Sequence, residues 1–132
     1  MNRSQEREQA FVVLFEKAFH PEESTADLQA LAIQSGFVSE SDFATRLLTT
    51  TEEHLGDIDA AISKYAIGWS LERMTKVALS IMRLAIAEML YMDDIPQGVS
   101  INEAVELAKK YAGKEDSSYI NGILGSISRA EE

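Results

Sequence analysis

VALSIMRLAIAEML, residues 77–90, is the most continuously apolar stretch of this chain. At 3.6 residues per turn its apolar side chains fall on every face, so other elements must cover such a helix on several sides. We therefore predict a helix over about 75–91 at the centre of the domain. Arg83 and Glu88 carry the charges within the stretch, and we predict that both pair with polar groups of neighbouring helices, because a buried charge needs a partner.

Helical periodicity continues on both sides of this stretch. The chain has two prolines and no alternating strand-like run bounded by turn residues. Apolar spacing and capping residues predict helices over 4–19 with Ser4 as N-cap, 24–34 with Ser24 as N-cap, 41–65 with a bend or break at Gly56, a short turn at 71–74, 100–112 opened by a capping box of Ser100 and Glu103, and 117–129. Six to seven helices with short loops predict an all-α fold, a single compact helical domain over 1–132.

The composition excludes several classes of protein. The 132 residues include no cysteine, which excludes disulfides, cysteine-ligated zinc and a thiol nucleophile. A hydrophobic fraction of 45% and a mean hydropathy of −0.12 are typical of a globular protein rather than a disordered one. No apolar run approaches the ~18 residues that span a bilayer, and the first residues lack the apolar core of a signal peptide. We therefore predict a cytoplasmic protein with no membrane contact.

Catalytic and metal-binding patterns are absent from the sequence. The two histidines, His20 and His54, have no second histidine at a metal-ligand spacing. No nucleophile elbow and no phosphate-binding glycine loop occurs, and the acidic runs lack the glycine and terminal glutamate of a calcium loop. The sequence therefore predicts a helical interaction protein with no enzymatic activity, no metal and no cofactor.

Charge is distributed unevenly along the chain. The net charge is −10, which by itself argues against nucleic-acid binding, because phosphates attract Lys and Arg. Residues 21–62 carry −8 of this total, residues 63–83 carry +3, and residues 84–132 carry −5. The acid excess is therefore concentrated in about a third of the sequence, and a face built from other segments is free of it.

Three blocks in the second half of the chain form a recognisable pattern. They are IMRLAIAEML at 81–90, IPQGVSINEAVELAKKY at 95–111 and SSYINGIL at 117–124. Near the start, REQA at 7–10 is followed by Leu14 and an aromatic residue. In this order and at this spacing the blocks resemble the NusB family of bacterial transcription antitermination factors. The resemblance covers nearly the whole chain and is strongest over 81–124.

The resemblance implies a fold and a function. It implies two helical sub-bundles, about 1–68 and 69–132, and no catalysis or cofactor. It implies binding to single-stranded boxA RNA as a heterodimer with NusE, a protein also found in the small ribosomal subunit. That complex helps RNA polymerase read through terminators, chiefly in ribosomal RNA operons. The same fold acting as a protein–protein adaptor or homodimer, with little direct RNA binding, is the alternative.

Two segments match the RNA-binding surface of the family. The first is the start of the N-terminal helix, and the second is the loop and first turn of the last helix. The residues that the resemblance implies are Arg3, Ser4, Arg7, Lys114, Asp116, Ser117, Ser118 and Tyr119. No residue is assigned to the NusE contact.

Physical arguments favour these residues without excluding simpler roles. Arg3 and Arg7 are four residues apart on one helix face, either as phosphate contacts or as surface charges. Ser117 and Ser118 at a helix N-terminus could offer backbone N–H groups to a phosphate, or act only as caps. Tyr119 could stack on an unpaired base, or pack against its own helix bundle. Because few cations are present, we expect weak RNA affinity that a basic partner such as NusE increases.

Overall fold

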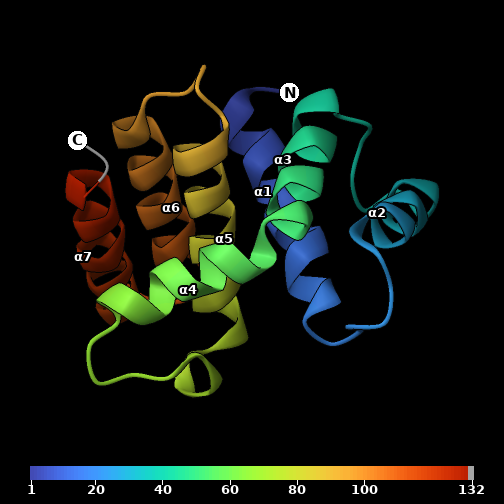
Figure 1. Ribbon diagram of the computed structural model, residues 1–132. Helices are drawn as coiled ribbons and strands as arrows, with labels where there is room; N and C mark the ends of the chain where they lie inside the picture. The colour runs from blue at the N-terminus through green and yellow to red at the C-terminus, as the bar shows by residue number, and fades with distance from the viewer. Residues whose placement is uncertain (131–132) are drawn as a thin grey trace.

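The computed structural model describes residues 1–130, and helices account for most of them. The elements are α1 (Arg3–Lys17), α2 (Thr25–Gln34), α3 (Asp42–Glu53), α4 (Leu55–Tyr65), the 3₁₀ helix η1 (Leu71–Arg73), α5 (Lys76–Tyr91), α6 (Gln97–Tyr111) and α7 (Lys114–Ala130). No strand occurs within residues 1–130, so the predicted all-α class is confirmed. Figure 1 shows α5 in the middle, with α1 and α3 on one side and α6 and α7 on the other.

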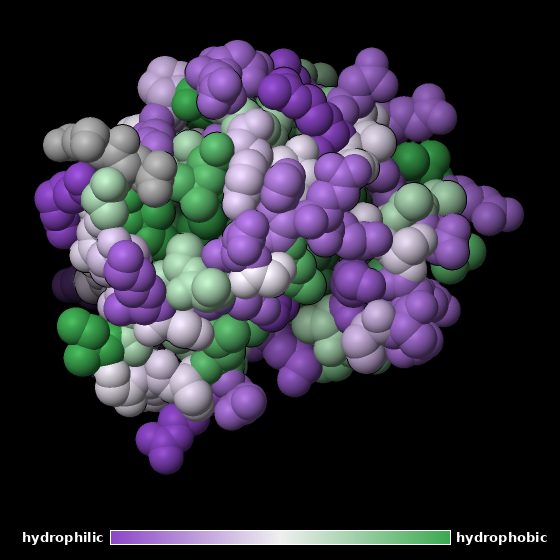
Figure 2. Space-filling model, in the orientation of Figure 1, coloured by the Kyte–Doolittle hydropathy of each residue, from purple (hydrophilic) through white to green (hydrophobic). Residues whose placement is uncertain are grey.

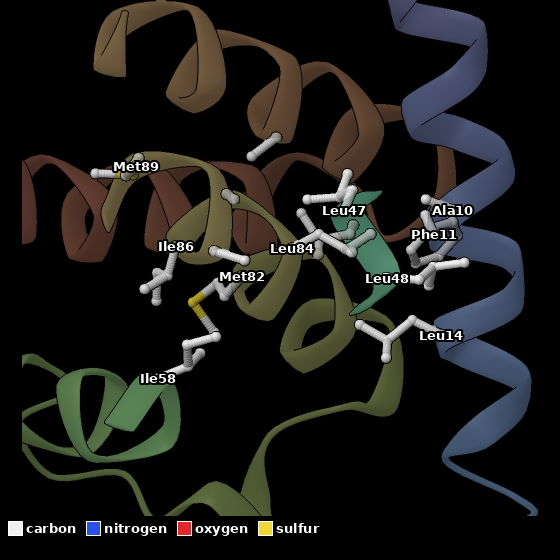
Figure 3. Packing of buried hydrophobic residues seen from close by; sticks show 14 of the residues in the cluster. Ala10, Phe11, Leu14, Leu47, Leu48, Ile58, Met82, Leu84, Ile86 and Met89 are labelled. Carbon is white, nitrogen blue, oxygen red and sulfur yellow. The ribbon is translucent and has the colours of Figure 1, made fainter. Parts of the chain in front are cut away.

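The central position predicted for α5 is confirmed. Most of its residues are buried, and it contacts α1, α3, α4, α6 and α7. In Figure 3, Met82 of α5 points toward Ile58 of α4, and Leu84 of α5 lies close to Leu47 of α3. All four side chains are 0–3% exposed, so one continuous core joins the two halves of the chain. A helix that is apolar on every face is stable here because each face meets another helix.

The helices form two groups of contacts that share α5. Helices α1, α2 and α3 contact one another, and α5, α6 and α7 do the same, while α1 and α3 also contact α5. Helix α4 contacts α5 and α7 in addition to α3, which places it against the C-terminal group. The division into sub-bundles at about residue 68 therefore stays a prediction.

Several predicted helix ends match the structure. Ser24 caps α2 and Ser41 caps α3, each accepting a hydrogen bond from the backbone N–H three residues later. The long helix predicted over 41–65 is broken at His54, two residues before Gly56, where one helix ends and the next begins. A glycine within a helix weakens it, which is consistent with the break beside that position.

Three predicted helix starts are wrong. Asn2, not Ser4, caps α1, because its side chain accepts from Gln5 N–H at 2.8 Å while Gln5 Oε1 accepts from Asn2 N–H at 2.9 Å. Helix α6 begins directly after Pro96, so Ser100 lies inside the helix and its predicted capping box does not exist. Helix α7 begins at Lys114, three residues before the predicted start.

Both charged residues of the central stretch are paired, as predicted. Arg83 donates two hydrogen bonds of 2.8 Å to the carboxylate of Asp59 on α4. Glu88 accepts two from Arg7 Nε, with Oε1 at 3.0 Å and Oε2 at 2.9 Å, and a third from the hydroxyl of Ser100 at 3.1 Å. Arg7, Glu88 and Ser100 thus link α1, α5 and α6 around a buried ion pair.

The outer surface is mainly hydrophilic. Figure 2 shows purple residues over much of the visible face, with hydrophobic residues in smaller separate patches. Among the described residues, no helix is both long enough and apolar enough to cross a bilayer.

Candidate nucleic-acid interface

The start of α1 holds three of the residues predicted to contact RNA, and the structure changes the role of Arg7. The residue is 5% exposed. Its guanidinium is bound to Glu88 and lies 3.9 Å from Glu103 Oε1. The prediction that it shares an exposed cationic face with Arg3 is therefore wrong, because its donors already have carboxylate partners in the core. Arg7 holds α1 against α5 and α6 instead.

Arg3 and Ser4 remain at the surface, but both already have partners. Arg3 Nη1 is 3.2 Å from Glu6 Oε1, and its guanidinium lies 4.2 Å from the ring centroid of Phe43. The hydroxyl of Ser4 donates to Glu103 Oε1 at 2.7 Å. Of Arg3, Ser4 and Arg7, only Arg3 is therefore an exposed cation. Glu6 on the same helix partly neutralises its charge.

The start of α7 holds the other five predicted residues. Lys114 and Ser118 are exposed, Asp116 and Tyr119 are half-buried, and Ser117 is buried. The N–H of Ser117 donates to the carbonyl of Gly113 and its hydroxyl to the carbonyl of Lys114. The prediction that Ser117 offers a free N–H to a phosphate is therefore wrong, because the helix begins earlier than the sequence indicates.

A cavity of about 320 Å³ lies between this end of α7 and the connector that joins α4 to α5. Asp116 and Tyr119 line it from α7. Glu115 also lines it from α7. The connector and α5 contribute the other lining residues, which are Trp69, Arg73, Met74, Thr75 and Ala78. The cavity therefore combines aromatic rings, one guanidinium and two carboxylates.

Tyr119 presents its ring, and not its hydroxyl, to this cavity. Its ring centroid is 6.1 Å from that of Trp69, with an angle of 62° between the planes. Its hydroxyl is buried and has no hydrogen-bond partner within residues 1–130. Burial raises the pKa of the Tyr119 hydroxyl above its usual value, so the group stays protonated at neutral pH. The residue therefore packs against the bundle and also forms a wall of the cavity.

The two predicted clusters do not form one compact site. Figure 1 shows the start of α1 at the upper end of the molecule and the start of α7 at the lower end. Within the described chain, no hydrogen bond or ion pair joins Arg3 or Ser4 to residues 114–119. A ligand that touched both clusters would have to be extended.

Sequence reasoning missed Trp69 and Arg73. The signal was present in the net charge of +3 over residues 63–83 and in the position of the chain's only tryptophan, in a connector between helices. An exposed tryptophan in a loop is costly to leave in water, so it is a good candidate for ligand contact. Proximity to Tyr119 across 50 residues of sequence could be seen only in the folded structure.

No group of three or more His, Asp or Glu side chains is close enough to hold a metal ion within residues 1–130. The ring of His54 stacks on Tyr91 with centroids 3.7 Å apart. The described chain is thus a helical bundle whose cavity beside α7 carries aromatic and charged side chains.

Comparison with known proteins identifies the family. A model of the NusB family matches residues 4–129. The chain therefore belongs to the NusB family, and the predicted resemblance is confirmed. It is 43% identical to the transcription antitermination protein NusB of Natranaerobius thermophilus, over 96% of this chain and 94% of that one. It is 44% identical to the protein of the same name from Desulforamulus reducens, over 96% and 90%.

Solved structures of NusB proteins share the fold. T. maritima NusB superposes with a TM-score of 0.89 and 32% identity, over 98% of this chain and 92% of that one. A NusB chain from a complex of the antitermination factors NusB and NusE with dsRNA superposes with a TM-score of 0.86 and 27% identity, over 97% and 96%. In that complex, NusB is found together with NusE and RNA.

Proposed function

We propose that this chain is a transcription antitermination factor that binds RNA together with NusE. The observation that carries the proposal is the match to antitermination proteins over nearly the whole chain, at 43% identity in one full-length case. A NusB chain of the same fold forms a complex with NusE and RNA. The protein would act in the bacterial cytoplasm, as part of the complex that helps RNA polymerase read through terminators, chiefly in ribosomal RNA operons.

The RNA we propose is a single strand of boxA type. Sequence-specific proteins usually recognise RNA through unstacked bases, which stack on aromatic or guanidinium planes and bond through their edges. The cavity beside Tyr119 offers these groups, with a tyrosine ring, an indole, one guanidinium and two carboxylates. Carboxylates accept hydrogen bonds from base amino groups, so the acidic wall is compatible with a base and unfavourable for a phosphate.

The predicted residues divide into contact and positioning roles in this proposal. Four residues at the start of α7 would contact RNA: Lys114, Asp116, Ser118 and Tyr119. Arg3 would bind the same strand at a nucleotide further along it. The buried residues Arg7 and Ser117 would support the surface from below, and the hydroxyl of the exposed Ser4 is already bonded to Glu103.

The charge of the chain makes the partner important. At a net charge of −10 the chain repels RNA at long range, so its own affinity is low. A basic partner would supply the positive field that draws the strand in. We therefore propose that NusE increases RNA affinity mainly through charge, and that this increase falls steeply as salt rises.

A titration of labelled boxA RNA tests the proposal directly. Anisotropy is measured with this chain alone, with NusE alone and with both, at low and at physiological salt. We expect weak binding by the chain and tighter binding by the pair. A duplex of the same sequence is titrated in parallel, because the solved complex of NusB and NusE contains dsRNA, and we expect it to bind less well than the single strand. Absence of binding under every condition at low salt would overturn the proposal.

A second function, as an adaptor or homodimer without direct RNA contact, rests on a different observation. Six of the twelve Lys and Arg side chains lie within 4.0 Å of a carboxylate in the described chain. Phe37, on the loop before α3, is 83% exposed. The homodimer alternative predicts self-association, which sedimentation of the chain alone across a concentration series measures. Both forms of the alternative predict that the chain and NusE together bind RNA no more tightly than NusE alone.

A further inference from the structure

The connector between α4 and α5 contributes the indole and the guanidinium of the cavity beside Tyr119. It runs over residues 66–75 and includes η1. Trp69 is 53% exposed and Arg73 is exposed, and both line the cavity opposite α7. A tryptophan that packs fully buries a large apolar area. Packing within the protein therefore does not explain why Trp69 is so exposed.

Arg73 is one of the six Lys and Arg side chains that have no carboxylate within 4.0 Å among residues 1–130. Each of Arg3, Arg46 and Lys110 lies within 3.2 Å of a carboxylate oxygen. Arg73 has no acid within 4.0 Å among residues 1–130, although Glu115 and Asp116 line the same cavity. Its guanidinium is therefore available to an anion, whereas the paired cations must first give up a partner.

The contact between the two aromatic rings excludes one way for a base to bind. Trp69 and Tyr119 already contact each other at a steep angle, so a flat ring does not fit between them. A base can stack on the exposed face of the indole, with its edge toward the carboxylates of α7. The phosphate of the same nucleotide would then lie on the side of the connector, where Arg73 provides the cation.

We propose that the connector is the second wall of a single-nucleotide site, in which Trp69 stacks on the base and Arg73 binds the adjacent phosphate. The inference rests on the proposed RNA-binding function and assigns it a further element. Base–aromatic stacking supplies sequence-tolerant affinity, and an arginine supplies charge neutralisation. The site thus takes one unpaired ribonucleotide of a strand.

Trp69 is itself the probe for the first test, because the chain contains one tryptophan. Single-stranded boxA RNA labelled with a dye gives the binding curve, and tryptophan emission is followed in a parallel titration with unlabelled RNA. We expect the emission to be quenched with the same midpoint as the binding curve. Trp69→Ala should weaken binding about tenfold, and Trp69→Phe should retain most of the affinity because it keeps an aromatic face.

Arg73→Ala tests the phosphate contact against a matched control. Neutralising one phosphate of a single strand contributes about 0.7 to the slope of log affinity against log salt. We expect Arg73→Ala to lower the slope by about that amount. Arg46→Ala removes an exposed arginine that is paired with Asp94, and should leave the slope unchanged.

The outcomes separate this inference from the function on which it rests. If RNA binds but the emission does not change, and Trp69→Ala and Arg73→Ala bind as the wild type does, the connector is not part of the site. If RNA binds under no condition, with or without NusE, both proposals fail. Circular dichroism of each variant confirms that the helices are intact before its affinity is interpreted.

Discussion

The start of α1 and the start of α7 carry similar polar residues, yet the structure uses them differently. At the start of α1, Arg7 is buried against Glu88, and Arg3 is paired with Glu6. At the start of α7, Lys114 is exposed with no acid partner among residues 1–130, and Tyr119 lines a cavity. The comparison teaches that the partners of a charged residue, more than its position in a motif, decide whether it can bind a ligand.

Breaking the buried pair should have the largest effect. Arg7→Ala leaves the carboxylate of Glu88 buried without its cation, which costs about 3–5 kcal/mol of stability. Urea unfolding followed by circular dichroism measures the loss. Arg3→Ala is the matched control at the surface of the same helix and should change stability by less than about 0.5 kcal/mol.

A double variant sharpens this result. Arg7→Met with Glu88→Leu replaces the pair by apolar groups of similar size, and such replacements are often neutral. Ser100 loses its carboxylate acceptor in this variant, which leaves one polar group to satisfy. We expect the double variant to recover most of the stability that Arg7→Ala loses. If it is as unstable as the single variant, the ion pair specifies the packing of α1 in a way that its charge alone does not explain.

The ring and the hydroxyl of Tyr119 should have separable effects. Tyr119→Ala removes the aromatic wall and should weaken RNA binding about tenfold in the anisotropy titration. Tyr119→Phe keeps the ring and removes a buried hydroxyl that has no partner within residues 1–130, so it should raise stability by about 1 kcal/mol at unchanged affinity. A loss of affinity in Tyr119→Phe would show that the hydroxyl takes part in binding.

Acid should weaken the contact between α1 and α6. Hydrogen bonds from Lys110 and Tyr111 lower the pKa of Glu8 below its usual value. The folded state therefore binds fewer protons at Glu8 than the unfolded state does, and the stability it contributes is present above about pH 4.3. That contribution disappears as the pH falls through the lowered pKa. Unfolding midpoints measured from about pH 6 to about pH 3 should fall less steeply for Glu8→Gln than for the wild type.

The smallest effect is expected at paired cations far from the cavity. Lys109 is paired with Glu106 on its own helix, and both side chains are more than half exposed. Lys109→Ala should change stability by less than about 0.5 kcal/mol, because exposed pairs contribute little. Its RNA affinity in the same titration should equal that of the wild type. A marked loss there would mean that the interface extends along α6.

Much of the fold could be predicted from periodicity, because each helix has an apolar stripe that must be buried. The centre of the bundle followed from a stretch with no polar face, and the need for partners at Arg83 and Glu88 followed from burial. Helix starts were harder, since Pro96 and Asn2 began helices earlier than the serines that matched capping patterns.

The candidate site was predicted only in part. A one-dimensional motif placed Lys114, Asp116 and Tyr119 at the start of one helix. It could not show that Arg7 points inward, since a helical residue's exposure depends on which neighbour covers its face. It also could not bring Trp69 next to Tyr119, because that proximity depends on how α4, α5 and α7 pack.

The Arg7–Glu88 pair has a consequence for the order in which the chain folds. Its partners lie 81 positions apart in sequence. A ribosome adds roughly 5–20 residues per second, so Glu88 is synthesised about 4–16 s after Arg7. During that interval Arg7 lacks its carboxylate partner, and α1 has only α2 and α3 of its final neighbours to pack against. The N-terminal helix is thus made first but secured late, once the central helix has been translated.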